Sequence, residues 1–107
     1  METVLELLSG PGNPRNSEGS FVALKDGRIL YVYTHYNGAS WHDHASADLA
    51  SRESRDGGRT WSDSDRMVVK NEGSANIMSV SLLRLQDGRI ALLYLRKDAQ
   101  PDGSITC

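Results

Sequence analysis

Asp43 stands in a segment whose residue types favour acid–base chemistry. Its neighbours are Trp41, His42 and His44, and binding loops often have such a composition. An apolar neighbour such as Trp41 could raise the pKa of the carboxyl group, which could then donate a proton at neutral pH. The histidines could hydrogen-bond the carboxyl group or substrate hydroxyls. We therefore take Asp43 as a candidate acid and both histidines as binding candidates; the alternative is that Asp43 caps a turn.

Arg15 is the candidate for binding an anionic group. It lies in the segment 14–19, which reads PRNSEG, ahead of the first apolar run. A guanidinium group binds a carboxylate through two parallel hydrogen bonds, which a lysine cannot copy. Glu18 follows shortly after Arg15 and could orient it or face the same site. The alternative is a solvated arginine in a loop rich in Pro and Gly.

A metal site is the other reading of the two histidines. On a strand, His42 and His44 would lie on one face and could share an ion. The only other histidine is His35, and no third ligand stands at a supporting spacing. The single cysteine, Cys107, allows no internal disulfide, and its terminal position argues against a catalytic role. We expect neither a metal nor a cofactor.

An internal repeat defines the elements that would position these residues. The run LKDGRILYVY at 24–33 returns as LQDGRIALLY at 85–94. We call the step from Leu24 to Leu85, which every position of the run shares, the repeat offset. In each copy Asp-Gly separates two apolar runs, which predicts a β-hairpin. Very little helix is expected, because no segment sustains a helical period. The predicted strands are 21–24, 29–36, 45–54 and 66–69 in the first unit, 80–85, 90–95 and the start of a third at 105–107 in the second, and a short strand at 5–8.

The segment from residue 54 to residue 61, SRDGGRTW, has a backbone role at almost every position. Asp-Gly-Gly predicts a tight hairpin turn, because Gly accepts positive φ without steric cost. The carboxylate of Asp56 could accept hydrogen bonds from turn N–H groups, and the hydroxyls of Ser54 and Thr60 could bind the same turn. Trp61 offers a large apolar face for packing one sheet against its neighbour.

The spacing S-x-D-x-G-x-T-W resembles the Asp box, or BNR repeat, of the sialidase (neuraminidase) superfamily, with Ser54, Asp56, Gly58, Thr60 and Trp61 at the defining positions. The resemblance implies an all-β fold of four-stranded antiparallel blades from a six-bladed β-propeller. Blade one would span about 15–70 and a partial blade two about 76–107. Because two blades cannot close a ring, residues 1–107 would be the N-terminal part of a larger propeller. A single small β-sandwich is the alternative.

The same resemblance implies a sialidase-like exo-glycosidase. In that family an Asp acts as acid and then base, a Tyr assisted by a Glu attacks the anomeric carbon, and three Arg hold the carboxylate of the sugar. The spacing from Asp43 to Ser54 is similar to that between the family's acid and its Asp box. Arg15 resembles the first arginine in position, although Asn16 and Ser17 replace the family's Ile-Pro. The other catalytic groups would come from missing blades, so this chain alone would be inactive.

Propeller geometry would gather active-site residues at one end of the central channel and put Asp boxes on the opposite rim. Asp56 is therefore expected to be structural. Arg96 follows the second hairpin, as His35 follows the first, and Arg96 is a further candidate for substrate binding. Asn76 stands one repeat offset after Arg15 and would lie on the innermost strand of blade two.

The resemblance implies a carbohydrate partner, either a sialoside or a related glycoside, and the composition argues against two other partner classes. The chain has 12 Lys+Arg against 14 Asp+Glu, a formal net charge of −2, which argues against nucleic acid or a membrane surface. No signal peptide is visible, which favours a cytoplasmic location. Two other functions stay open. One is a non-catalytic carbohydrate-binding or assembly propeller with structural Asp boxes, and the other is an exo-glycosidase acting on a neutral sugar.

Overall fold

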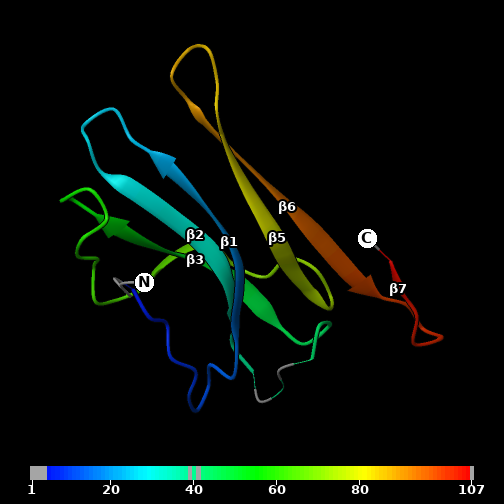
Figure 1. Ribbon diagram of the computed structural model, residues 1–107. Helices are drawn as coiled ribbons and strands as arrows, with labels where there is room; N and C mark the ends of the chain where they lie inside the picture. The colour runs from blue at the N-terminus through cyan, green and yellow to red at the C-terminus, as the bar shows by residue number, and fades with distance from the viewer. Residues whose placement is uncertain (1–4, 39, 41, 107) are drawn as a thin grey trace.

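The computed structural model describes residues 5–38, 40 and 42–106. These residues form two antiparallel sheets, which lie beside each other (Figure 1). Sheet 1 has the order β1-β2-β3-β4 and sheet 2 the order β5-β6-β7. Among the described residues there is no helix, and hence none long and apolar enough to cross a membrane. The strands are β1 Asn16–Ala23, β2 Ile29–Tyr36, β3 Ala47–Ser54, β4 Arg66–Val69, β5 Asn76–Arg84, β6 Ile90–Ala99 and β7 Ile105–Thr106.

The predicted all-β class is confirmed, and most predicted strands are present. The bounds predicted for β2 and β4 are confirmed, whereas β1 and β5 begin earlier than predicted, β6 ends later, and β3 begins at Ala47. The short strand predicted at 5–8 is wrong, because this segment does not join either sheet. It lies beside sheet 1, where the carbonyl of Leu7 accepts a hydrogen bond from the Asn16 side chain at 3.0 Å.

The repeat is reproduced in the geometry of the hairpin turns. Leu24 N–H donates to the Arg28 carbonyl at 2.7 Å, and Leu85 N–H donates to the Arg89 carbonyl at 2.8 Å. Each turn has an Asp carboxylate that accepts the N–H of the nearby Arg and a Gly with positive φ, a conformation that favours Gly. A third turn of this kind joins β6 to β7, with Gly103 at φ 87°. This third turn was not predicted from the sequence.

The first strands of the two sheets carry a matching irregularity. The register of β1 shifts between Ser17 and Gly19, and the register of β5 shifts between Met78 and Ser81. Ser79, one repeat offset after Glu18, lies in the second shift with φ 58°. Its hydroxyl donates to the Glu18 carboxylate at 2.8 Å. The bulges therefore recur with the repeat and meet where β1 and β5 lie side by side.

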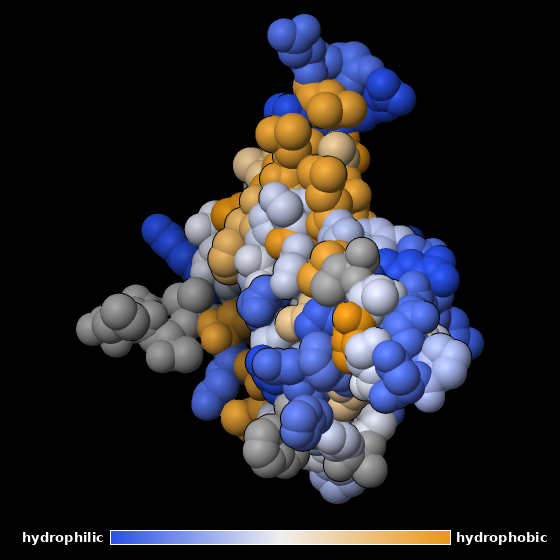
Figure 2. Space-filling view, turned by 90° about the vertical axis from the view of Figure 1, so that its right-hand side faces the viewer, coloured by the Kyte–Doolittle hydropathy of each residue, from blue (hydrophilic) through white to orange (hydrophobic). Residues whose placement is uncertain are grey.

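The hydrophobic core lies between the two sheets. Val32 and Leu49 come from sheet 1, and Ile77 and Val80 come from sheet 2. We call the face that each sheet turns toward the other its inner face, and the opposite face its outer face. On sheet 2 the outer face is apolar, and Figure 2, which views the molecule from that side, shows a column of apolar side chains running up it.

An aromatic cluster covers the outer face of sheet 1. Phe21 and Tyr31 have ring centroids 4.4 Å apart, and Tyr31 stacks on Tyr33 at 5.6 Å. Trp61 lies against this cluster, 5.9 Å from Phe21. Among the described residues Trp61 therefore packs on its own sheet, and its predicted packing against a neighbouring sheet stays a prediction. The connection that carries Trp61 folds back over the outer face of its own sheet, where the other aromatic rings already stand.

Replacing Gly19 should disturb this cluster. A Cβ atom at Gly19 would lie 2.5 Å from the Tyr31 ring, and that ring is confined between Phe21 and Tyr33. We expect Gly19→Ala to lower the free energy of unfolding by about 1–3 kcal/mol, measured by urea denaturation. Gly10→Ala is the control, because no atom lies within 4 Å of its added Cβ. Equal stability of the two variants would contradict this packing.

Candidate functional site

Arg15 and Asp43 form an ion pair at one end of sheet 1. Arg15 Nη1 lies 2.6 Å from Asp43 Oδ1. Arg15 directly precedes β1, and Asp43 belongs to the loop between β2 and β3. Asp43 is well exposed, with 67% of its side chain accessible, and Arg15 is partly covered. Two candidates that are far apart in the sequence are thus in direct contact.

The end of the β1–β2 ladder holds Arg15 in place. Its carbonyl accepts the Tyr36 N–H at 3.0 Å. The Asn13 side chain donates to the carbonyls of both Arg15 and Tyr36, at 3.2 and 2.7 Å. The guanidinium carbon lies 4.9 Å from the centre of the buried Tyr36 ring, within cation–π range. Sequence reasoning missed this role of Tyr36.

Sheet 2 holds the loop that carries Asp43. The Asn76 side chain, at the start of β5, donates to the carbonyls of Asp43 and Ala45 at 2.7 and 2.8 Å. Asn76 is fully buried, and its Oδ1 has no hydrogen-bond partner among the described residues. Both hydrogen bonds that the Asn76 amide donates therefore go to the loop, while its buried oxygen stays unpaired. Asn76 stands one repeat offset after Arg15, so the repeat predicts that both residues lie near the start of the first strand of their units.

The charges around Asp43 contradict the raised pKa expected from its sequence neighbours. The hydrogen bond and charge of Arg15 hold the pKa of Asp43 below its ordinary value, and Lys97 and His44 act in the same direction. The same hydrogen bond raises the pKa of Arg15. In this state Asp43 is an ionised acceptor, because a cation is its direct partner. Trp41 lies outside the described residues.

Lys97 is a nearby cation that sequence reasoning missed. It is buried in β6 and pairs in register with Asn76. It stands one repeat offset after Tyr36, so the repeat brings Lys97 beside Asn76 as it brings Tyr36 beside Arg15. The same offset that located the hairpins could have identified it.

Glu18, His42 and His44 surround the pair without forming a metal site. Glu18 is exposed and accepts a hydrogen bond from Ser79, and its charge is the smallest cause of the raised pKa of Arg15, of which the hydrogen bond that Arg15 donates to Asp43 is the largest. His42 and His44 are exposed and lie in a turn, so the alternation of a strand does not apply to them. The part of the chain that the structure describes contains no group of three His, Cys, Asp or Glu side chains placed to hold a metal ion.

Arg96 and His35 have partners other than Arg15 and Asp43. Arg96 Nε lies 3.2 Å from Asp98 Oδ2, and both residues belong to β6. His35 Nε2 lies 3.5 Å from Asp65 Oδ2, on the outer face of sheet 1. Because adjacent side chains of a strand point to opposite faces, His35 is on the other side of the sheet from Tyr36 and Arg15.

Asp65 is the centre of a second polar cluster. It accepts hydrogen bonds from the Tyr33 hydroxyl and from Arg52 Nε, the latter at 2.8 Å. Burial raises the pKa of Asp65, but these two hydrogen bonds and the charges of Arg52 and His35 together outweigh burial and leave the pKa lowered. Burial, and then Asp65, raises the pKa of Tyr33. No sequence pattern indicated this cluster, because its members come from β2, β3 and the connection before β4.

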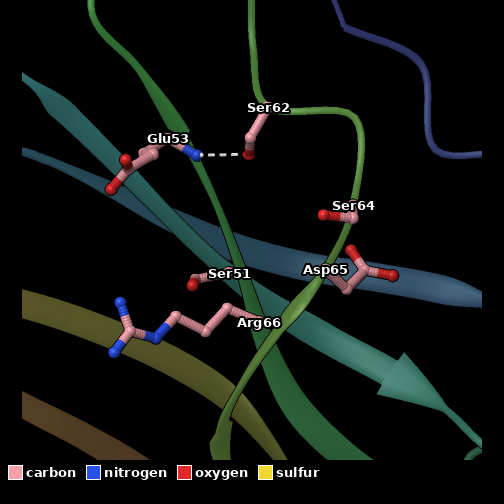
Figure 3. Close-up of a pocket in the computed structure, with 6 residues that line it drawn as sticks. All are labelled: Ser51, Glu53, Ser62, Ser64, Asp65 and Arg66. Carbon is pink, nitrogen blue, oxygen red and sulfur yellow. Dashed lines mark hydrogen bonds between the residues drawn. The ribbon is translucent and has the colours of Figure 1, made fainter.

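Two open, polar cavities adjoin Asp65. One, of about 350 Å³, lies between the N-terminal segment and sheet 1 and is lined by Leu7, Asn13 and Tyr33 among others. The other, of about 170 Å³, is drawn in Figure 3, where Ser62 accepts the Glu53 N–H and the side chains of Asp65 and Arg66 point apart. Asp65 is thus directed to the outer face, where its partners lie.

The Asp box forms a hydrogen-bonded turn at the opposite end of sheet 1. Ser54 donates to Asp56 Oδ1 at 2.9 Å and accepts the Gly58 N–H at 2.9 Å. Asp56 also accepts the N–H and the hydroxyl of Thr60, and Trp61 Nε1 donates to the Gly58 carbonyl at 3.1 Å. These hydrogen bonds hold the backbone of the turn, and the structural role expected for the box stays a prediction. The predicted tight hairpin is wrong, because the connection spans 55–65.

The chain matches no protein-family model, and a search of the curated proteins finds no match either. The functional interpretation therefore depends on the two opposite ends of sheet 1. One end carries the exposed ion pair, and the other carries the hydrogen-bonded turn of the Asp box.

Acid should weaken the Asp box. The hydrogen bonds from Thr60, followed by those from Ser54 and Arg59, lower the pKa of Asp56 from 3.8 to about 2. A carboxylate with a lowered pKa stabilises the fold above its ordinary pKa, and the contribution is lost as the pH falls from about 4 to about 2. We expect Asp56→Asn to be less stable than the parent at pH 7, with a difference that shrinks below pH 4.

Urea denaturation at neutral and acidic pH measures this difference. Asp63→Asn is the control, because it makes the same charge change in the same connection without removing a turn hydrogen bond of the box. A stability difference between the Asp56 variant and the parent that stays constant down to pH 2 would contradict the assignment.

Proposed function

We propose that this chain is part of a sialidase-like exo-glycosidase, a glycoside hydrolase. Arg15 binds the carboxylate of the sugar, and Asp43 serves as acid and then base at the glycosidic oxygen. The observation that carries the proposal is the contact between Arg15 and Asp43, at the end of the sheet opposite the Asp box. The spacing of Asp43 and Ser54, which resembles that of the sialidase superfamily, supports the same roles.

In this proposal the two sheets are blades of a six-bladed β-propeller. The four-stranded antiparallel order of sheet 1 supports this interpretation. So does the recurrence of the hairpin turns and of the bulges at the repeat offset. A β-sandwich that uses each hairpin once has no reason to repeat such details. The Tyr–Glu pair and the remaining arginines belong to further blades, so the 107 residues alone are catalytically inactive.

The ion pair suggests how an acid with a lowered pKa can work. A carboxylate on the substrate competes with Asp43 for the guanidinium of Arg15. Once Asp43 loses that hydrogen bond, the main cause of its lowered pKa is removed, and the carboxyl group takes up a proton more readily. In this proposal the side chains of Glu18, His42, His44 and Arg96 bind the hydroxyls of the sugar.

An Asp43→Asn variant of the complete propeller tests the acid role. An activated aryl glycoside needs little protonation of its leaving group, whereas a poor leaving group depends on the acid. We expect turnover of the poor substrate to fall by about 10²–10⁴-fold and turnover of the aryl glycoside to fall much less. Asp102→Asn, in the exposed β6–β7 turn, should leave both rates unchanged. Equal losses on both substrates would remove Asp43 from this role.

A non-catalytic carbohydrate-binding or assembly propeller is the second candidate. The lowered pKa of Asp43 in its contact with Arg15 favours it, because that carboxylate is ionised at neutral pH. Fluorogenic aryl glycosides, with a sialoside among them, separate the two functions. Sialoside turnover supports the first candidate, and turnover of a neutral sugar alone keeps a glycosidase but removes the carboxylate role of Arg15. Binding without turnover supports the second candidate.

A further inference from the structure

A buried lysine on sheet 2 lies beside the candidate site. Lys97 on β6 is only 9% exposed, and among the described residues its ammonium group makes no hydrogen bond and no ion pair. Asp98, the next residue along β6, accepts hydrogen bonds from the Ser74 N–H and from Arg96 instead. Lysine is almost never buried unless it is paired, because burying an unpaired charge is unfavourable. An anionic partner would therefore stabilise this ammonium group.

The side chain of Lys97 is on the same face of sheet 2 as the loop that carries Asp43. Lys97 and Asn76 are directly opposite each other in the β5–β6 ladder, so their side chains share a face. The Asn76 amide donates to the Asp43 carbonyl at 2.7 Å, which places the loop on this face too. The hydrogen bond from Arg15 is the main cause of the lowered pKa of Asp43, and the charge of Lys97 acts in the same direction. The charges of Lys97 and Asp43 therefore interact.

Each sheet thus contributes one cation to the same loop. In sheet 1 the cation is Arg15, which directly precedes β1 and lies over the Tyr36 ring on β2. One repeat offset later, Asn76 takes the place of Arg15, and Lys97 takes the place of Tyr36. The cation has moved from the first strand of the unit to the second, but it lies at the same end of the sheet. Asp43 interacts with both cations.

We propose that Lys97 is a specificity-determining residue of the candidate site, and that its ammonium group and the Arg15 guanidinium together bind the carboxylate of an acidic sugar. The inference rests on the proposed function for the identity of the ligand. The Asp43 carboxylate already interacts with both cations, so the charges at this site suit a carboxylate. Arg15 can donate two parallel hydrogen bonds, Lys97 supplies a point charge, and a carboxylate has acceptor positions for both.

The second cation makes the site selective for an acidic sugar. A neutral sugar of the same shape would leave the Lys97 ammonium group unpaired, and an unpaired buried charge is unfavourable. An acidic sugar would pair it. The bound carboxylate would also offset the charge of Lys97 near Asp43, in addition to displacing Asp43 from Arg15. Two cations that lower the pKa of Asp43 in the free protein would then be compensated by the ligand.

Calorimetric titration of the complete protein with sialic acid and with its methyl ester tests the inference. The ester has the same sugar without the negative charge. We expect the wild type to bind the acid more tightly than the ester. Lys97→Met should weaken binding of the acid by about tenfold and leave binding of the ester unchanged. Lys25→Met is the control, because it removes the same charge from the exposed β1–β2 turn at the opposite end of sheet 1. It should leave both affinities unchanged.

A second measurement needs only the wild type and so does not depend on how a variant folds. With lysine labelled at Cε, the NMR signal of Lys97 should shift when the acid is added and stay in place when the ester is added. Wild-type affinity of Lys97→Met for the acid would overturn the inference, and so would a wild type that does not bind the acid. If the variant loses acid and ester equally, the Cε signal decides: a signal that stays in place at saturating acid overturns the inference, and one that shifts with the acid alone supports it.

Turnover of an aryl sialoside separates this inference from the proposed function. Binding of the acid that depends on Lys97, without turnover of the sialoside, would contradict the glycosidase and support the role of Lys97. Turnover by Lys97→Met with the KM of the wild type would support the glycosidase and overturn the role of Lys97.

Discussion

The packing of β5 against sheet 1 is the interaction on which the rest of this structure depends. It buries Ile77 and Val80 against Val32 and Leu49. Apolar burial of this kind is the main favourable contribution to folding. The same strand makes polar contacts along its length. Leu82 N–H donates to the Ser20 hydroxyl at 3.1 Å, so hydrogen bonds as well as apolar contacts align β5 with β1.

The first residue of β5 extends this packing to the candidate site. Asn76 is buried because β5 is packed, and its amide then reaches the backbone of the loop that carries Asp43. Arg15 is placed independently by the β1–β2 ladder. The ion pair therefore joins two segments, and each segment is positioned by a different sheet. Because the pair is open to solvent, water screens the attraction between the two side chains, and exposed pairs of this kind are weak. In the proposed function a competing carboxylate separates Asp43 from Arg15 without disturbing either sheet.

Local chemistry was predictable from the sequence, whereas features that rest on packing were missed. The Asp-Gly turns and the Asp box were recognisable because a short run of residues determines each one. The repeat offset placed Arg15, Asn76 and both hairpins at the correct ends of the strands. By contrast, Trp61 could be seen to be apolar, but the face it covers depends on how the connection 55–65 folds back. The pKa of Asp43 could not be predicted from Trp41, because Arg15, distant in the sequence, controls it.

The most direct test of this account is the titration of Asp43 with and without a carboxylated sugar. The carboxyl carbon of Asp43 reports its pKa by NMR, and an α-sialoside supplies the competing carboxylate. The account predicts that Asp43 titrates below its ordinary value in the free protein and that its pKa rises when the sialoside occupies Arg15. In an Arg15→Lys variant the sialoside should have much less effect. A pKa of Asp43 that stays the same at saturating sialoside would contradict the exchange of carboxylates at Arg15, on which the proposed role of both residues depends.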